Sequence, residues 1–169
     1  MEIWDGLKRD GSLAGVDLIR GNAIPDGLYH LVCDILVRHT DGDYLLMQRD
    51  FSKKIYGGYY EATAGGSALK GEDSLTCAKR ELFEETGIGE GIFEELDRCV
   101  CEYNKSIYHI YLCVTSHGKN KISLQKGETI AYKWLTEQEF ISYINSDKMI
   151  EAQIRRYKNY FEKMGYLNE

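Results

Sequence analysis

Three glutamates share one face of a predicted helix near the middle of the chain. Glu81, Glu84 and Glu85 stand at positions i, i+3 and i+4, so a helix brings their carboxylates together. Like charges at this spacing repel one another, by a few tenths of a kcal/mol per pair on an exposed surface. They also fall in the last turn before Gly87, the end of the helix dipole that disfavours anions. A hard divalent cation such as Mg²⁺ offsets this repulsion, because it takes carboxylate oxygens as ligands.

Two neighbouring residues bear on the charge of this cluster. Glu72 adds a fourth acid from the loop before the helix, and Arg80 offsets one of the negative charges but not all of them. Three nearby glutamates without further context are most often a solvated acidic surface. The residues around them decide between that interpretation and a metal site.

The stretch from Gly66 to Ile88 resembles the signature of the Nudix hydrolases. That signature is Gly, five residues, Glu, seven residues, Arg-Glu-aliphatic, one residue, Glu-Glu, one residue, Gly-aliphatic. Nine fixed positions are filled without a gap or a substitution: Gly66, Glu72, Arg80, Glu81, Leu82, Glu84, Glu85, Gly87 and Ile88. A weaker resemblance extends from about Tyr29 to Tyr143. The resemblance implies hydrolysis of a diphosphate bond in a nucleoside diphosphate that is linked to another group.

The same resemblance implies a role for each matching residue. Glu81, Glu84 and Glu85 match metal-binding positions, so we expect them to hold Mg²⁺ or Mn²⁺, with one carboxylate of the group as a candidate general base. The backbone carbonyl of Gly65 is a further expected ligand. Arg80 is expected to orient the glutamates through a charge-assisted fork rather than to touch the substrate. Such metal ions polarise phosphoryl oxygens and lower the pKa of bound water, which is what cleavage of a pyrophosphate requires.

Four candidates lie outside the signature. Glu128 precedes a predicted strand, where many members of the family place a further acid as ligand or base, and a plain surface glutamate is the alternative. Arg49 ends a strand that points toward the active site in the family, so it is expected to hold a phosphate, with a surface ion pair as the alternative. Lys54 and Tyr60 are expected to grip a phosphate and to stack on a base, although aromatic side chains more commonly belong to a core or rim.

Two other interpretations stay open. Type 1 isopentenyl-diphosphate isomerases share the fold, and His30 and the stretch from Ser52 to Lys54 resemble them. That family relies on a cysteine and a metal-binding histidine just before the signature, where this chain has Gly65 and Ser67. The second alternative is a non-catalytic domain that senses a nucleotide. Sensors often lose acids of the signature, whereas this chain keeps every one.

Composition sets the class of protein. A chain of 169 residues with 43% hydrophobic and 28% charged residues is typical of one globular domain, here residues 1–169. No apolar run approaches the roughly 18 residues of a membrane span, so we expect a cytoplasmic protein without a membrane partner. The net charge of −6 argues against non-specific nucleic-acid binding, which leaves a small nucleoside diphosphate derivative as the expected partner. Five cysteines without a C-x-x-C pair indicate reduced thiols. A homodimer is expected from the family alone.

Hydrophobic periodicity predicts the elements that position these residues. An N-terminal hairpin and connector occupy residues 1–27. Strands are expected at 28–38, 44–49, 61–64, 93–102, 107–115 and 129–135, and helices at about 74–86, 137–145 and 148–164. This order suits an α/β/α sandwich with a mixed β-sheet between helices, and resemblance to the Nudix fold implies the same architecture.

Two of these helices have a predicted buried face. In the signature helix, Asp73 or Ser74 is the expected N-cap and Gly87 the expected left-handed C-cap. Its buried stripe is expected to consist of Leu75, Ala78 and Leu82. The stripe of the C-terminal helix is expected to consist of Ile150, Ile154, Tyr157, Phe161 and Met164.

Overall fold

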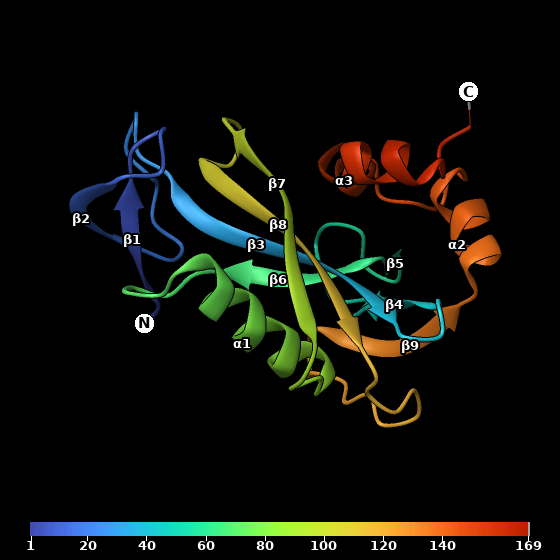
Figure 1. Cartoon of the computed structure of the whole chain (residues 1–169). Coiled ribbons are helices and arrows are strands. Elements are labelled where there is room, and N and C mark those ends of the chain that lie inside the picture. Colours follow the sequence, from blue (N-terminus) through green and yellow to red (C-terminus); the bar gives the residue numbers. More distant parts are fainter. Residues whose placement is uncertain (169) are drawn as a thin grey trace.

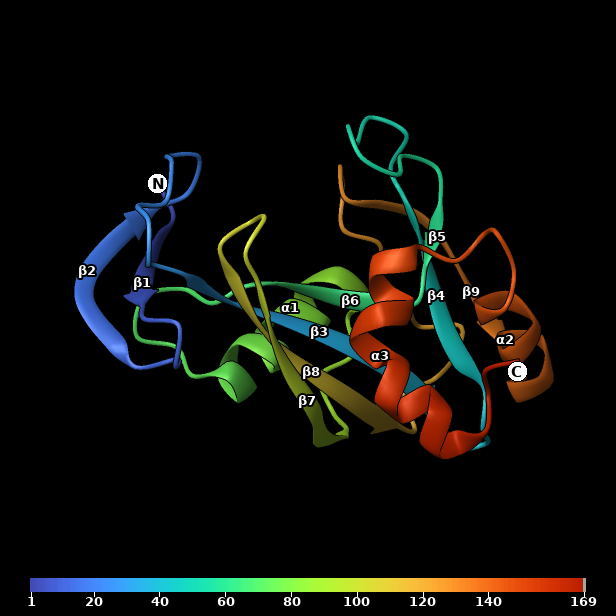
Figure 2. The ribbon, with the colours of Figure 1, turned by 90° about the horizontal axis from the view of Figure 1, so that it is seen from above.

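A mixed β-sheet forms the middle layer of the structure, and helices cover both of its faces (Figures 1 and 2). The computed structural model describes residues 1–168. The strands are β1 (Ile3–Leu7), β2 (Leu13–Ile19), β3 (His30–His39), β4 (Tyr44–Arg49), β5 (Tyr60–Glu61), β6 (Thr63–Ser67), β7 (Ile92–Cys101), β8 (Ser106–Thr115) and β9 (Thr129–Leu135). The helices are α1 (Ser74–Thr86), α2 (Glu137–Ile144) and α3 (Glu151–Met164).

Strand β3 lies at the centre of the main sheet. The strand order is β5-β4-β3-β8-β7, with β6 added to β3 and β9 added to β4. Side chains of β3 alternate between two buried clusters: Cys33 and Ile35 pack on the side of α1, and Leu36 packs on the side of α2 and α3. A sheet buried on both faces between helices is the α/β/α sandwich that the sequence predicted, and that prediction is confirmed.

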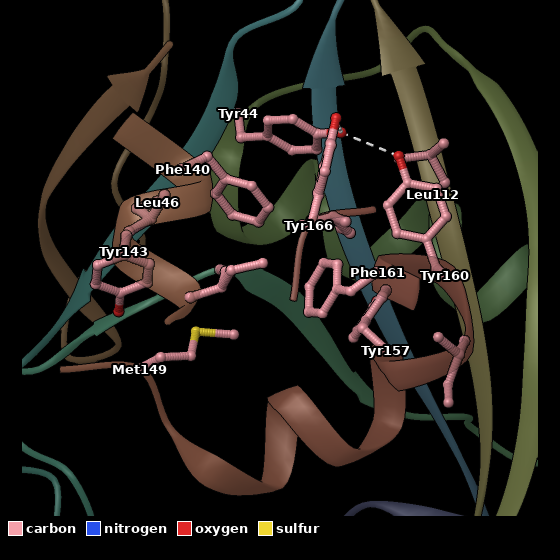
Figure 3. Packing of buried hydrophobic residues seen from close by; sticks show 14 of the residues in the cluster. Tyr44, Leu46, Leu112, Phe140, Tyr143, Met149, Tyr157, Tyr160, Phe161 and Tyr166 are labelled. Carbon is pink, nitrogen blue, oxygen red and sulfur yellow. Dashed lines mark hydrogen bonds between the residues drawn. The ribbon is translucent and has the colours of Figure 1, made fainter. Parts of the chain in front are cut away.

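Aromatic side chains dominate the cluster beneath α2 and α3 (Figure 3). The rings of Tyr44 and Phe140 are stacked with their centroids 4.0 Å apart. The hydroxyl of Tyr44 lies 3.0 Å from that of Tyr160, which joins β4 to α3. Tyr157 and Phe161 are fully buried against the sheet. This packing fixes α3 over the sheet and thereby places its polar side chains near the site described below.

Helix α3 departs from its prediction in two respects. It begins at Glu151 rather than at residue 148, and Met164, expected in the buried stripe, is 38% exposed. The buried face instead includes Gln153 and Tyr160, which a turn of about 100° per residue places on the same side as Tyr157. Met164 shares that direction but is the last residue of the helix, where less of the chain covers it.

Helix α1 has the predicted caps and a shifted buried face. Asp73 is the N-cap, and its side chain accepts a hydrogen bond of 2.7 Å from the N–H of Thr76. Gly87 ends the helix in the left-handed conformation, with φ 76°. Leu75, expected in the buried stripe, is 39% exposed, and Cys77 is buried instead. Leu75 points in the same direction as the buried Leu82 and Thr86, but it lies in the first turn, where less of the chain covers it.

The N-terminal hairpin lies apart from the main sheet, beside the start of α1 (Figure 1). Strands β1 and β2 pair antiparallel, as predicted. The hairpin joins the rest of the fold through a bridge in which Leu7 and Tyr29 exchange backbone hydrogen bonds of 2.8 and 2.9 Å. Among the described residues, no helix has the length and apolar character that a membrane crossing requires.

Candidate active site

Two connected cavities lie along the acidic end of α1. The first, called the inner cavity here, has a volume of about 220 Å³ and is lined by Asp34, Arg49, Glu61, Thr63, Gly65, Glu85, Glu128, Thr129, Gln153 and Arg156. The second, called the outer groove, has a volume of about 340 Å³ and is lined by Glu2, Arg20, Gly65, Gly66, Ser67, Leu69, Arg80, Glu81, Glu84, Glu85, Gln125 and Glu128. Gly65, Glu85 and Glu128 belong to both, so these three residues mark the junction.

Glu85 is the most strongly perturbed acid at this junction. Burial raises the pKa of its carboxyl well above the ordinary value, and the nearby charges of Glu61 and Glu81 raise it further. The backbone N–H of Gly65 donates to Glu85 Oε2 at 3.2 Å. A half-buried carboxylate among other carboxylates has a large electrostatic need for a cation.

Arg80 holds the other acids of the signature in place. Its Nη1 donates to Glu81 at 2.7 Å and to Glu84 at 3.3 Å. Its Nε and Nη2 form a fork with the two oxygens of Glu72, at 2.8 and 2.9 Å. The fork lowers the pKa of Glu72, whereas burial raises the pKa of Glu81. Arg80 therefore engages both oxygens of Glu72 but only Oε1 of Glu81, which lines the outer groove.

Two glycines allow the backbone to approach these groups closely. A Cβ on Gly65 would lie 1.9 Å from the carbonyl oxygen of Cys33 on the neighbouring strand β3. A Cβ on Gly66 would lie 2.5 Å from the carboxylate carbon of Glu81. A side chain at Gly65 would separate β6 from β3, and a side chain at Gly66 would displace the carboxylate of Glu81.

The sequence interpretation missed six polar residues that line the inner cavity: Asp34, Glu61, Thr63, Thr129, Gln153 and Arg156. Asp34 pairs with Arg156, and Gln153 donates to Thr63 Oγ1 at 2.8 Å and to Glu61 Oε2 at 3.3 Å. Burial raises the pKa of Asp34 and of Glu61. A signal was present, because Asp34 interrupts an otherwise apolar strand, and Gln153 and Arg156 stand at i and i+3 on α3.

The predicted residues outside the signature divide into two groups. Glu128 and Arg49 line the inner cavity, where Glu128 pairs with Lys53, and Arg49 Nη1 donates to the two oxygens of Glu61 at 3.0 and 3.1 Å. Lys54 is exposed and lines neither cavity.

Tyr60 faces away from the acids. It lines a separate pocket, in which the ammonium of Lys133 lies 4.1 Å from the centre of its ring. Successive side chains of a strand point to opposite faces, so Tyr60 turns outward where Glu61 turns into the inner cavity. The structure therefore does not bring Tyr60 and Lys54 together with the predicted metal ligands.

His30, which resembles a metal ligand of the isomerases, lies outside both cavities. Its ring is stacked on Trp4 with centroids 4.2 Å apart, and its Nε2 lies 2.7 Å from Ser106 Oγ. Burial lowers the pKa of His30 to about 4, so the ring is neutral at pH 7. In this surrounding the histidine packs the N-terminal hairpin against β3.

The chemistry of the acids at the junction fits a hard divalent ion. Within residues 1–168, no three Asp, Glu, His or Cys side chains stand close enough, as placed, to enclose a metal. Glu81 and Glu84 are turned to Arg80, whereas Glu85 has a single backbone donor. Oxygen ligands that need a cation and leave room for substrate oxygens are what Mg²⁺ and Mn²⁺ prefer. Arg80 engages Glu81 through Oε1 alone, so the second oxygen of Glu81 can take part, and these residues therefore fit such an ion.

Comparison with known proteins agrees with this geometry. The family model described as NUDIX domain matches residues 28–159. The chain is 29% identical over 150 residues to the uncharacterized Nudix hydrolase lmo0368 of Listeria monocytogenes, with 89% of each chain covered. The crystal structure of DR0079 from Deinococcus radiodurans superposes with a TM-score of 0.70 at 16% identity, covering 92% of this chain and 98% of that one.

A second similar structure has a name that states its ligands. It is a bifunctional NMN adenylyltransferase/ADP ribose pyrophosphatase from Francisella tularensis, complexed with AMP and a manganese ion. It superposes with a TM-score of 0.60 at 22% identity and covers 80% of this chain and 42% of that one. The match to the NUDIX domain extends over more than half of the chain, and it confirms the family that the signature predicted. The chain belongs to the Nudix hydrolase family and is a pyrophosphohydrolase of the Nudix type.

Proposed function

We propose that the protein hydrolyses a diphosphate bond in a nucleoside diphosphate linked to another group, and that the reaction depends on Mg²⁺ or Mn²⁺. The observation that supports this most is the placement of Glu85. Its carboxylate lies at the junction of the two cavities, with its pKa raised by burial and by other acids and with one backbone N–H as donor. A divalent cation compensates such a carboxylate and can take phosphate oxygens as further ligands.

In this proposal the residues of the two cavities have distinct roles. Glu81, Glu84 and Glu85 hold the divalent ion with the Gly65 carbonyl, and Arg80 keeps the first two in position through the contacts described above. A bound divalent ion supplies neutralisation of the phosphoryl oxygens as charge develops on them. Glu128 lines both cavities beside Glu85 and is the candidate general base. Arg49 is the candidate phosphate ligand of the inner cavity.

ADP-ribose is the first compound to test, because a similar structure is named as an ADP ribose pyrophosphatase with AMP and manganese. The lining residues of the inner cavity are charged or polar apart from Gly65, which suits the polar group that is attached to the nucleoside diphosphate. The five cysteines are unpaired, which supports a cytoplasmic location.

The decisive experiment is a hydrolysis panel of ADP-ribose, nucleotide sugars and dinucleoside polyphosphates with Mg²⁺ or Mn²⁺. The wild type is expected to release a mononucleotide from at least one compound, and chelation is expected to abolish the release. E85Q is expected to lose at least about 100-fold in kcat/KM, since a ligand and charge disappear together. E90Q, which alters an exposed glutamate after the helix, is the matched control and is expected to retain the wild-type rate.

The same panel separates the alternatives. Conversion of isopentenyl diphosphate without release of phosphate would establish an isomerase. Tight binding of a nucleotide without turnover would establish a sensor. Either result, together with an inactive wild type on every diphosphate compound, overturns the hydrolase proposal.

A further inference from the structure

The N-terminal hairpin places a second arginine in the outer groove. Arg20 follows β2, and Glu2 precedes β1, yet both side chains line the groove that contains Arg80 and Glu81. Neither residue belongs to the Nudix signature. Figure 2 shows the hairpin at one end of the molecule, where β1 meets the loop that leads from β6 toward α1.

Contacts with the signature loop fix the position of this hairpin. The backbone N–H of Lys70 donates to the carbonyl of Ile3 at 2.9 Å, and the N–H of Gly71 donates to Asp5 Oδ2 at 2.7 Å. The ammonium of Lys70 also pairs with Asp17 Oδ2 at 2.6 Å. Lys70 and Gly71 lie between Gly66 and Glu72 of the signature. These contacts therefore fix the position of the hairpin relative to the proposed metal-binding acids.

A chain of contacts then orients the guanidinium of Arg20. Trp4 is buried and stacked on His30, and its Nε1 donates to Glu2 Oε1 at 2.7 Å. The second oxygen of Glu2 accepts from Arg20 Nη1 at 2.7 Å. The backbone N–H of Arg20 donates to the carbonyl of Glu2 at 3.0 Å. Packing thus fixes Trp4, the hydrogen bond from Trp4 orients the carboxylate of Glu2, and that carboxylate orients the guanidinium of Arg20.

The other cations of the two cavities are engaged by the protein. Arg80 is held by three carboxylates and a carbonyl, and Arg49 and Arg156 are each paired with a carboxylate. Arg20 differs from them, since its side chain is 67% exposed and Glu2 is its one side-chain partner within the described part of the chain. Its Nε and Nη2 donors are therefore available in the groove.

An exposed ion pair such as Glu2–Arg20 contributes little to stability. Stability therefore does not explain why Trp4 and Glu2 orient the Arg20 side chain. A planar guanidinium with donors to spare matches the oxygens of a phosphate group. We propose that Arg20 binds a phosphate of the substrate at the outer end of the groove, while Glu2 keeps hold of Nη1. Resting on the proposed function, this inference names Arg20 as a substrate-binding residue that the N-terminal hairpin supplies.

The test uses imidodiphosphate, a diphosphate that resists hydrolysis, and measures its binding in the presence of Mg²⁺ by calorimetry. R20A is expected to raise the dissociation constant about 10-fold to 100-fold, the usual effect of losing a charge-assisted contact. R20K is expected to have a dissociation constant between those of the wild type and R20A, because lysine keeps the charge and loses the forked guanidinium. R9A is the matched control, since Arg9 lies in the turn between β1 and β2, is 71% exposed and has its own ion pair with Glu102 at 3.0 Å. It is expected to bind like the wild type.

Melting curves accompany every variant, and R20K provides the comparison if R20A unfolds early. Equal dissociation constants for R9A and the Arg20 variants overturn the inference, and so does a wild type that binds no imidodiphosphate. The proposed function fails in a different way. A wild type that binds imidodiphosphate through Arg20 and cleaves nothing in the panel removes the hydrolase assignment and leaves Arg20 as a phosphate ligand.

Discussion

The backbone N–H of Gly65 lies 3.2 Å from Glu85 Oε2 and joins strand β6 to the last turn of α1. Burial and the charges of Glu61 and Glu81 act in the opposite direction on this carboxylate and raise its pKa. One neutral donor does not compensate a partly desolvated charge. The metal-free protein therefore carries a destabilising group at its candidate active site, and several properties of the protein depend on it.

Replacing this group should stabilise the metal-free protein. E85Q keeps the shape and an acceptor for Gly65 and removes the charge, so we expect its melting temperature in a chelator to exceed that of the wild type by several degrees. Mg²⁺ is expected to raise the melting temperature of the wild type and to leave that of E85Q nearly unchanged. A lower melting temperature for E85Q than for E90Q in the chelator would contradict this account.

The pH dependence follows from the direction of the same pKa shift. An acid with a raised pKa in the folded state binds its proton more tightly there than in the unfolded chain. Metal-free stability should therefore fall as the pH rises from about 4.5 through the raised pKa of Glu85. The difference in unfolding free energy between E85Q and the wild type should widen over this interval. Urea unfolding at a series of pH values measures it, and a constant difference would argue against a shifted Glu85.

The fork between Arg80 and Glu72 predicts coupling between two residues that are eight positions apart. E72Q and R80K each break the same fork and loosen the hold on Glu81. We expect each change to lower kcat/KM about 10-fold or more, and the double variant to lose much less than the product of the two effects. A double-mutant cycle in kcat/KM and in unfolding free energy measures the coupling. Strict additivity in both quantities would show that the fork does not position the acids.

The sequence was sufficient for the fold because its local signals agreed with one another. Asp73 and Gly87 cap α1 as predicted, and the strand pattern from residue 129 to 135 matches β9. These features depend on short-range chemistry, namely a side chain that accepts from nearby N–H groups and alternation along a strand. The stripe prediction for α1 was wrong at Leu75, because the amount of covering chain at each turn is a property of the whole fold.

The candidate site was predictable only where one continuous segment carries it. The acids of α1 lie within five residues of one another, so helical spacing alone brought them together. Arg20, Asp34 and Arg156 come from three distant parts of the chain, and their positions along the two cavities depend on how the hairpin, β3 and α3 pack. Tyr60 shows the same limit, since a one-residue alternation decides that Glu61 and not Tyr60 faces the cavity.

His30 predicts a loss of stability in acid. Burial lowers the pKa of His30 from 6.5 to about 4 in the folded protein. Between these two pH values His30 is protonated in the unfolded chain and neutral in the folded one. Stability should therefore fall as the pH drops from 6.5 toward 4, by up to roughly 3 kcal/mol from this group. H30Q is expected to flatten the dependence in that window. Equal slopes for H30Q and the wild type in urea unfolding would rule out this role.

A substitution at Gly65 should be far more damaging than one at Gly71, although both glycines have positive φ angles, 154° and 84°. A Cβ at Gly65 meets the carbonyl oxygen of Cys33 at 1.9 Å, so G65A must push β6 away from β3. A Cβ at Gly71 meets nothing within 4 Å, so G71A has only the strain of a left-handed alanine, about 1 kcal/mol. We expect G65A to lose more than about 3 kcal/mol of stability and most of its Mg²⁺ affinity, since the strand also holds Glu85. Urea unfolding and Mg²⁺ calorimetry compare the two variants, and similar losses in both would refute a close-packed β6.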